Sequence, residues 1–386
     1  MEFLAGRNLA YNMRSFLYSG GDWKNLSSKQ NLCLALHSSL ESLHHLPNVA
    51  KSFSGPISLS LFTPGTDYSK IDLFFRNMAR CFPEIMRRMS LHAMFPTKIP
   101  LETESKTQFE SMDCSNPRQF ITTLLQKQSP HLQKLTYPQC HLRNLAQLGC
   151  QTPFTFVIDI DMRIPEQLDL GVEGFLKSQS NYCPNCVFIL PVYEINTTQN
   201  KDRVPQNKKQ LLKQIKMKQA RIYHMQTYSW GQKMSNLDLW ERLNESTSLE
   251  VAYGLERYQF TYEPMFIGPT SIPLFDERFD GFGLCRNTQF YELFVAGFQF
   301  KFLNNGFLTH IGFKVPGQRE QWKFKELVKN QRLIPQFALE IRARYGQDPC
   351  EMSLKLRTFP ASKWKDIQCA NTTPSNKQYK LRQNNN

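Results

Sequence analysis

Strand-like and helix-like segments alternate over the first hundred residues, and this order restricts the fold more than any other feature of the sequence. A short apolar run at 32–36 is followed by a helical pattern at 40–53. Residues 57–62 alternate apolar side chains with serine, 71–82 repeat apolar positions at helical spacing, and 89–95 is again strand-like. This β-α-β-α order predicts an α/β fold with a mostly parallel, Rossmann-like central sheet and helices on both faces.

The rest of the chain divides into a few further segments. We expect a poorly patterned N-terminal segment at 1–29, one folded domain at 30–365 and a polar, disordered tail at 366–386 that is rich in Asn, Gln and Lys. Residues 97–130 are predicted to be irregular. Helices are predicted at 137–148 and, as one long helix bent at Pro335, at 319–345. Strands are expected at 154–160 and 187–192.

The chain is basic, with 47 Lys and Arg against 33 Asp and Glu and a formal net charge of +14. Such a balance favours polyanionic partners, among them acidic glycans, nucleotide diphosphates, anionic lipid and nucleic acid. The densest basic stretch, 208–221, has apolar residues at near-helical spacing, so we interpret it as the solvated face of an amphipathic helix. The sequence contains no nucleic-acid-binding motif, and we therefore expect no nucleic-acid partner.

The ten cysteines are scattered along the chain. Cys183 and Cys186 form a single CxxC motif, which supplies only two of the four ligands that a structural zinc site needs, so disulfides in an oxidising compartment are preferred. Four Asn-x-Ser/Thr sequons favour the same compartment, at Asn25, Asn196, Asn244 and Asn371. There is no run of 18 apolar residues and no signal-peptide core in the first 30, so no membrane anchor is expected within this sequence.

Two acidic residues follow the most strand-like segment of the chain. Asp159 and Asp161 lie at its end, with Ile160 between them facing the other way. Ligands bind at this edge of open α/β sheets, and two close carboxylates repel each other unless a cation lies between them. Oxygen ligands favour Mn²⁺ or Mg²⁺, which a nucleotide-sugar donor needs because its departing diphosphate develops negative charge. On spacing alone, the acid pair of a hydrolase or phosphatase stays open.

Longer blocks of the sequence resemble the glucuronyltransferase branch of glycosyltransferase family 49. They stand in the family's order at 156–165, 187–195, 262–266, 275–283, 291–298 and 306–314, and the resemblance covers about 31–350. It implies that 30–365 is a catalytic domain of the GT-A glycosyltransferase fold, with a UDP-sugar donor, an inverting reaction and a glycan or glycoprotein acceptor. It also implies residence in the Golgi lumen or Golgi membrane. The sequence leaves a homo-oligomer open.

The resemblance implies roles for individual residues. The ligands of the metal ion, which is Mn²⁺ or alternatively Mg²⁺, are expected to be Asp159, Asp161 and His310. The residues that bind the donor are expected to be His37, Arg143, Asp159 and Lys314.

Inversion requires a base opposite the leaving group, to accept the proton of the acceptor hydroxyl. The resemblance favours Asp276 for this role. Glu277 and Glu263 are the alternatives, and salt bridges to Arg278 or another basic residue are a purely structural interpretation of the pair at 276–277.

Four places in or near the expected pocket depart from the family pattern. Arg163 replaces an apolar residue, Ile311 replaces a lysine, Cys140 replaces an asparagine, and Leu284-Cys285 replaces Phe-Asn. These departures leave the identity of the sugar open. Glucuronic acid is favoured, in which case Arg286 or Arg163 should pair with its carboxylate. N-acetylglucosamine transfer from UDP-GlcNAc and a non-catalytic, glycan-binding relative are the alternatives.

Overall fold

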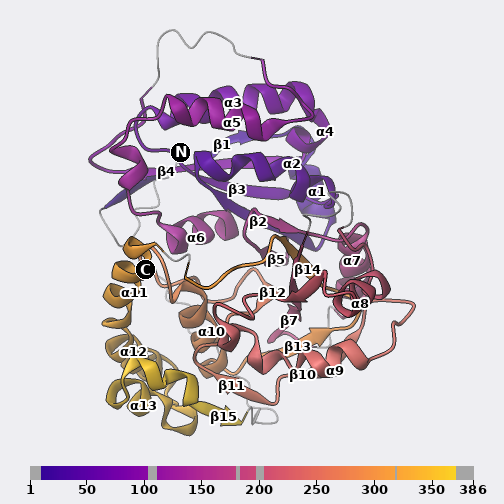
Figure 1. Ribbon diagram of the computed structural model, residues 1–386, viewed down its shortest axis with the longest axis vertical. Helices are drawn as coiled ribbons and strands as arrows, with labels where there is room; N and C mark the ends of the chain where they lie inside the picture. Colours follow the sequence, from indigo (N-terminus) through magenta and orange to yellow (C-terminus); the bar gives the residue numbers. More distant parts are fainter. Residues whose placement is uncertain (1–9, 103–110, 180–182, 197–203, 318–319, 371–386) are drawn as a thin grey trace.

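The computed structural model describes residues 10–102, 111–179, 183–196, 204–317 and 320–370, and a nine-stranded sheet runs through its centre (Figure 1). In spatial order the strands are β1 (Tyr11–Ser19), β4 (Met89–Pro96), β3 (Ile57–Phe62), β2 (Leu32–Ser38), β5 (Phe154–Val157), β12 (Met265–Pro269), β7 (Cys186–Leu190), β13 (Gln299–Leu303) and β10 (Val251–Gly254). Only β1, β12 and β10 run against the common direction. The predicted α/β fold with a mostly parallel sheet is confirmed.

Helices cover both faces of the first half of this sheet (Figure 1). One face carries the 3-10 helix η1 (Leu40–His45) and the helices α2 (Leu46–Lys51), α3 (Asp67–Cys81) and α5 (Pro117–Gln126), whereas α6 (Gln139–Gly149) crosses the other. The shorter elements here are α1 (Trp23–Lys29), α4 (Pro83–Arg87) and η2 (Leu132–Lys134). The helices predicted at 40–53, 71–82 and 137–148 are confirmed. The prediction that 97–130 is irregular is wrong at α5, which buries an apolar face formed by Phe120, Ile121 and Leu124.

The N-terminal segment has more structure than its sequence pattern predicts. Within residues 1–29, strand β1 and helix α1 form, and β1 pairs antiparallel with β4, with a break in register between Arg14 and Tyr18. Most β1 side chains are exposed, so this edge strand lacks the apolar alternation that identifies a strand in a sequence.

The second half of the chain adds a small sheet beside the large one. Its strands are β6 (Met162–Arg163), β14 (Leu308–Ile311), β8 (Val192–Ile195) and β9 (Ala220–Ile222). The strand predicted at 187–192 is therefore two strands, β7 and β8, which are separated by Pro191. The helices of this half are α7 (Leu168–Gln179), α8 (Lys208–Lys216), α9 (Leu237–Arg242) and α10 (Cys285–Val295), with 3-10 turns η3 (Ser229–Gly231) and η4 (Lys233–Ser235).

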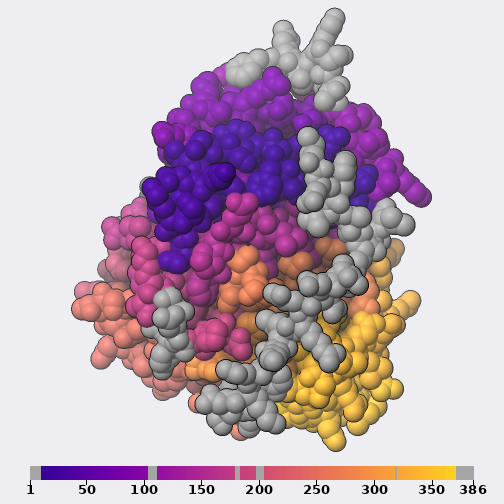
Figure 2. Space-filling view, turned by 180° about the vertical axis from the view of Figure 1, so that it is seen from behind, coloured from indigo at the N-terminus to yellow at the C-terminus, as the bar shows by residue number. Residues whose placement is uncertain are grey.

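The C-terminal residues form a helical layer at one end of the molecule, opposite the N-terminal part (Figure 2). It contains α11 (Gln321–Gln331), α12 (Ile334–Tyr345), η5 (Pro349–Glu351), α13 (Met352–Thr358), η6 (Ala361–Asp366) and the strand pair β11 (Arg257–Gln259) and β15 (Gln368–Ala370). The single helix predicted at 319–345 is wrong, because Pro335 starts a new helix instead of bending one. The disordered tail predicted at 366–386 is wrong at β15, and residues 371–386 lie outside the described part.

All ten cysteines form disulfides, as predicted in preference to a zinc site: Cys33–Cys150, Cys81–Cys114, Cys140–Cys285, Cys183–Cys186 and Cys350–Cys369. The helix predicted over the basic stretch 208–221 is confirmed only at α8, because Ala220 and Arg221 belong to strand β9, and Lys208 is fully buried instead of solvated. Its Nζ donates to Asn304 Oδ1 over 2.8 Å and lies 4.1 Å from the centre of the Trp240 ring. Among the described helices, none has the length and apolar character needed to cross a membrane.

Candidate active site

The two aspartates lie in the loop that leaves the sheet at β5. The strand ends at Val157, so Asp159 and Asp161 follow it instead of belonging to it. The N–H of Met162 donates to the carbonyl of Asp159, and the chain then enters β6, which pairs with β14. The buried side chain of Ile160 anchors the loop. Both carboxylates are thereby presented at the carboxyl edge of β5, where ligands bind in open α/β sheets.

Three donors surround one oxygen of Asp159. The Nη2 atoms of Arg143 and Arg286 each lie 2.9 Å from Asp159 Oδ1, and His37 Nε2 lies 3.2 Å from the same oxygen. Burial raises the pKa of Asp159, but the charges of Arg286 and Arg143 outweigh this effect and hold the pKa well below its usual range. Within the described residues, Asp159 Oδ2 has no hydrogen-bond partner and remains open to a ligand.

His37 is placed by the end of β2 and links Asp159 to Tyr137. Its Nδ1 lies 2.7 Å from the Tyr137 hydroxyl, and burial lowers the pKa of His37. A neutral ring that donates from Nε2 to Asp159 and accepts at Nδ1 from the Tyr137 hydroxyl satisfies both contacts. His37 therefore orients Asp159 without adding charge.

Asp161 pairs with His310, which lies 149 positions further along the sequence. His310 is on β14, opposite Met162 of β6, and this pairing brings its Nε2 to 3.2 Å from Asp161 Oδ2. His310 Nδ1 lies 3.2 Å from the carbonyl oxygen of Gly312, which can only accept, so Nδ1 carries a proton. Nε2 of His310 then faces the Asp161 carboxylate in one of two ways. It either donates as the second N–H of an imidazolium, or it presents a lone pair. A lone pair would repel the carboxylate unless a cation lay between the two groups.

Lys314 lies close enough to affect Asp161 electrostatically. Burial raises the pKa of Asp161, but the hydrogen bond and charge of His310, together with the charge of Lys314, lower it overall. The main-chain N–H of Lys314 donates to the buried carboxylate of Glu194, which also binds Arg221. The structure thus brings together Asp161, His310 and Lys314.

Two further residues join the site: Tyr223, for which the sequence predicted no role, and Glu263, which the sequence offered only as an alternative base. Tyr223 follows β9 and its ring centre lies 5.6 Å from that of His310. Burial, followed by the charges of Asp161 and Asp159, raises the pKa of the Tyr223 hydroxyl well above its usual value. No sequence signal pointed to Tyr223, because the polar loop around it has no motif.

Glu263 is the second of these residues, and it precedes β12. Burial raises the pKa of Glu263 to about 7, although the charges of Arg286 and Arg143 and a hydrogen bond from Asn287 act in the opposite direction. Its main-chain N–H donates to the carbonyl of Gly231. A carboxyl with this pKa is suited to proton transfer near neutral pH, and it lies within electrostatic range of the Asp159 group.

Asp276 and Glu277 have partners of their own. Asp276 Oδ2 lies 2.6 Å from Arg278 Nη2, and Arg278 also binds Glu340, which is the structural alternative considered for this pair. Glu277 accepts a hydrogen bond of 3.0 Å from Asn144.

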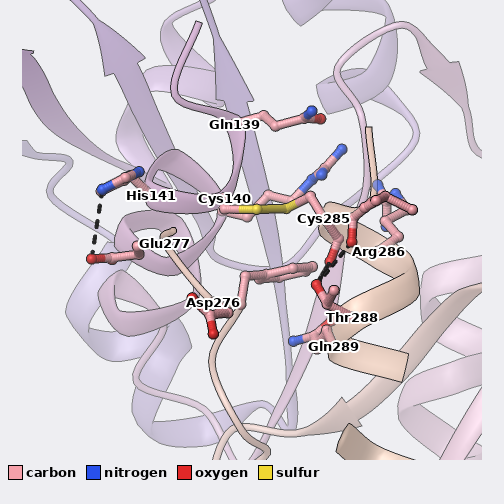
Figure 3. The surroundings of a disulfide bond; sticks show 12 residues. Gln139, Cys140, His141, Asp276, Glu277, Cys285, Arg286, Thr288 and Gln289 are labelled. Atoms are coloured by element: carbon pink, nitrogen blue, oxygen red, sulfur yellow. Dashed lines mark hydrogen bonds and ion pairs between the residues drawn. A yellow bond between two sulfur atoms is a disulfide. The ribbon is translucent and has the colours of Figure 1, made fainter. Parts of the chain in front are cut away.

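Figure 3 shows Glu277 directed toward His141, on the other side of Cys140 from Arg286. In the described part of the chain, neither Asp276 nor Glu277 contacts the aspartates at 159 and 161. Their assignment as bases stays a prediction.

The predicted metal ligands are only partly brought together. Asp161 and His310 are adjacent, but the contacts of Asp159 are with arginines and His37. Among the residues that the structure describes, no three His, Cys, Asp or Glu side chains are grouped so that they could hold a metal ion. The three-ligand assignment therefore stays a prediction.

Several proteins of known sequence or structure are similar to this chain. Human β-1,4-glucuronyltransferase 1 is 29% identical over 334 residues, which are 84% of this chain and 79% of that protein. Human xylosyl- and glucuronyltransferase LARGE1 is 24% identical over 218 residues, covering 54% of this chain and 27% of that protein. Residues 1–349 of TarS from S. aureus align with a TM-score of 0.40 and 9% identity, over 81% of this chain and 65% of that one.

The family itself is identified by a match to its family model. The model of the glycosyltransferase family described as "Glycosyl-transferase for dystroglycan" matches residues 31–346, which is most of the described chain and includes every residue discussed at the site. The chain therefore belongs to glycosyltransferase family 49 and is an enzyme of the glycosyltransferase class.

Proposed function

We propose that this enzyme transfers glucuronic acid from UDP-glucuronate to a hydroxyl group of a glycan or glycoprotein acceptor, with inversion at the transferred carbon. The observation that carries the proposal is the pairing of Asp161 with His310 next to Asp159 with its two arginines, at the edge of the sheet. The names of the similar human enzymes support glucuronic acid as the sugar.

Asp161 and His310 suit a divalent cation held jointly by protein and substrate. Mn²⁺ and Mg²⁺ commonly take one or two protein ligands and complete their coordination with water and phosphate oxygens, so a pair of ligands is sufficient. The lone pair of a neutral His310 and the Asp161 carboxylate would face the same ion. When bound there, the ion would neutralise the charge that develops on the departing diphosphate.

The Asp159 group suits the nucleotide end of the donor. With Asp159 Oδ1 saturated by three donors, Oδ2 is free to accept a hydrogen bond from a hydroxyl of the ribose or of the sugar. Arg143 and Arg286 place two positive charges beside it, and Lys314 adds a third near Asp161. These charges favour a diphosphate over a neutral ligand.

Glu263 is the base that its electrostatic environment favours over Asp276. The carboxylate of Asp276 is neutralised by Arg278, whereas the pKa of Glu263 is about 7 and its carboxyl is near the Asp159 group. In the proposed reaction the acceptor oxygen forms a bond to the anomeric carbon. The bond from that carbon to the diphosphate breaks, UDP leaves with the electron pair, and Glu263 takes the hydroxyl proton.

Residence in the Golgi lumen is part of the proposal. The five disulfides require an oxidising compartment, and the sequon residues Asn25 and Asn244 are exposed, as glycosylation requires.

The proposed function is tested by measuring UDP release with Mn²⁺ and a panel of UDP-sugars, with and without acceptor glycans. UDP-glucuronate should be the preferred donor. Preference for UDP-GlcNAc would instead support N-acetylglucosaminyl transfer. Binding of UDP without turnover of any donor would support a non-catalytic, glycan-binding protein and contradict the proposal.

The charge of the donor sugar can be tested at Arg163. Its Nη1 donates to the main-chain carbonyls of Met162 and Asp161, whereas its Nε and Nη2 have no hydrogen-bond or ion-pair partner within the described residues. A hydrogen bond between charged groups contributes about 1.5–3 kcal/mol. Arg163→Met should therefore lower kcat/KM for UDP-glucuronate roughly 10- to 100-fold more than for UDP-glucose, which lacks only the carboxylate.

Arg286→Met provides the comparison, because Arg286 already binds Asp159 and should affect both donors. Equal losses for the two donors in Arg163→Met would show that Arg163 does not bind the carboxylate.

A further inference from the structure

The Cys140–Cys285 disulfide joins the two helices that supply the arginines on Asp159 (Figure 3). Cys140 precedes Arg143 by one turn of α6, and Cys285 is the first residue of α10, directly before Arg286. Both cysteines are buried and their Cα atoms are 5.8 Å apart. The covalent link therefore lies within one helical turn of each of the two arginine residues.

The two guanidinium groups need to be held together. Both donate to the same oxygen of Asp159 over 2.9 Å, and their like charges repel each other. Burial, followed by the charge of Arg286, lowers the pKa of Arg143. A small separation of α6 from α10 would break at least one of the two contacts, because a single oxygen atom cannot follow both donors.

The start of α10 is held partly by hydrogen bonds from α11, because the Asn330 amide donates to the carbonyls of Asp280, Phe282 and Gly283. Its N-cap residue, Leu284, has a positive φ of 67° and provides no side-chain cap. The preceding Gly281 and Gly283 also have positive φ values, of 82° and 94°. Positive φ is unfavourable for leucine, and glycine costs backbone entropy to order, so the turn depends on contacts from other elements. The disulfide at the first helical residue adds the covalent restraint that ties α10 to α6.

We propose that the Cys140–Cys285 disulfide is a positioning element that holds Arg143 and Arg286 together on Asp159 and thereby sets the affinity of the enzyme for the UDP part of its donor. This proposal rests on the proposed function, because it takes the Asp159 group to be the nucleotide site.

The experiment compares two double variants of the whole protein. Cys140→Ala/Cys285→Ala should raise the KM for the UDP-sugar and the Kd for UDP with Mn²⁺ about 10-fold or more, with a smaller change in kcat, since misplacement by about 1 Å is costly. Cys350→Ala/Cys369→Ala removes the disulfide that links η5 to β15 in the C-terminal layer. It should lower the Tm while leaving both constants at the parent's values. All constants are measured well below each Tm.

A mutant cycle with Arg286→Ala separates positioning from general stabilisation. If the disulfide acts through the arginines, its loss should add little to the effect of Arg286→Ala on the Kd for UDP. Cys140→Asn/Cys285→Asn provides a variant in which a hydrogen bond can replace the covalent link. It should bind UDP more tightly than the alanine pair, and it decides the question if the alanine pair does not fold.

The proposal is overturned if the variants without this disulfide bind UDP as tightly as the parent, or if their effect adds fully to that of Arg286→Ala. UDP binding is measured by calorimetry without an acceptor, so the two proposals can fail separately. If the parent binds UDP but transfers no sugar, the proposed transfer is refuted, and the UDP affinities of the variants still test the role of the disulfide. A parent that binds no UDP overturns both proposals.

Discussion

Asp161→Asn is expected to reduce Mn²⁺-dependent UDP release by about 10³-fold or more in kcat/KM, because the proposed cation would lose the carboxylate that pairs with His310. A loss of this size corresponds to about 4 kcal/mol, within the range that a metal ion contributes to stabilising a leaving group. The measurement is UDP release against Mn²⁺ concentration. His310→Ala should act in the same direction.

Asp72→Asn is a suitable control, since the Asp72 side chain is 44% exposed and forms a helix-surface pair with Arg76. It should retain activity within about twofold of the parent, because surface ion pairs contribute little. Undiminished activity of Asp161→Asn, or turnover by the parent in the presence of a strong chelator, would contradict a metal ion at this position.

Glu263→Gln should lower kcat by about 10²- to 10⁴-fold, the usual contribution of a general base. The sign of the pH dependence follows from the raised pKa of Glu263, about 7. A base acts in its deprotonated form, so kcat/KM of the parent should rise as the pH increases to 7 and level off above it. The remaining activity of Glu263→Gln should lack this step.

Asp276→Asn distinguishes the two candidate bases. Asp276 forms a salt bridge with Arg278, so its replacement should cost some stability and less than about tenfold in kcat. If Asp276→Asn instead shows the large loss and removes the pH step, then Asp276 is the base that the family resemblance favoured and Glu263 is not.

The fold was predictable where burial leaves a periodic pattern. β2, β3 and β4 are buried strands between helices, and their apolar runs identify them. β1 could not be identified in the same way, because it is an edge strand whose side chains face mostly outward. The division between α11 and α12 was missed because Pro335 can either bend a helix or start one, and only the packing of the two segments decides.

The site was predictable only in part. The strand-end position identified Asp159 and Asp161, and the resemblance supplied His310, whose pairing with Asp161 depends on the register of β14 against β6. The sharing of Asp159 by Arg143 and Arg286 has no local signal, because α6 and α10 are far apart in the sequence. The raised pKa of Glu263 depends on its burial in the fold, and the residues next to it in the sequence do not indicate that burial.

The edge position of β1 has a practical consequence. The family match begins at residue 31, so a shortened protein designed from that boundary would lack β1, and the N–H and C=O groups of β4 would be left without partners. An open strand of this kind can pair with the same strand of another molecule and cause self-association. Recombinant versions that start at residue 31 should therefore elute as larger species in size-exclusion chromatography than versions that retain Tyr11–Ser19.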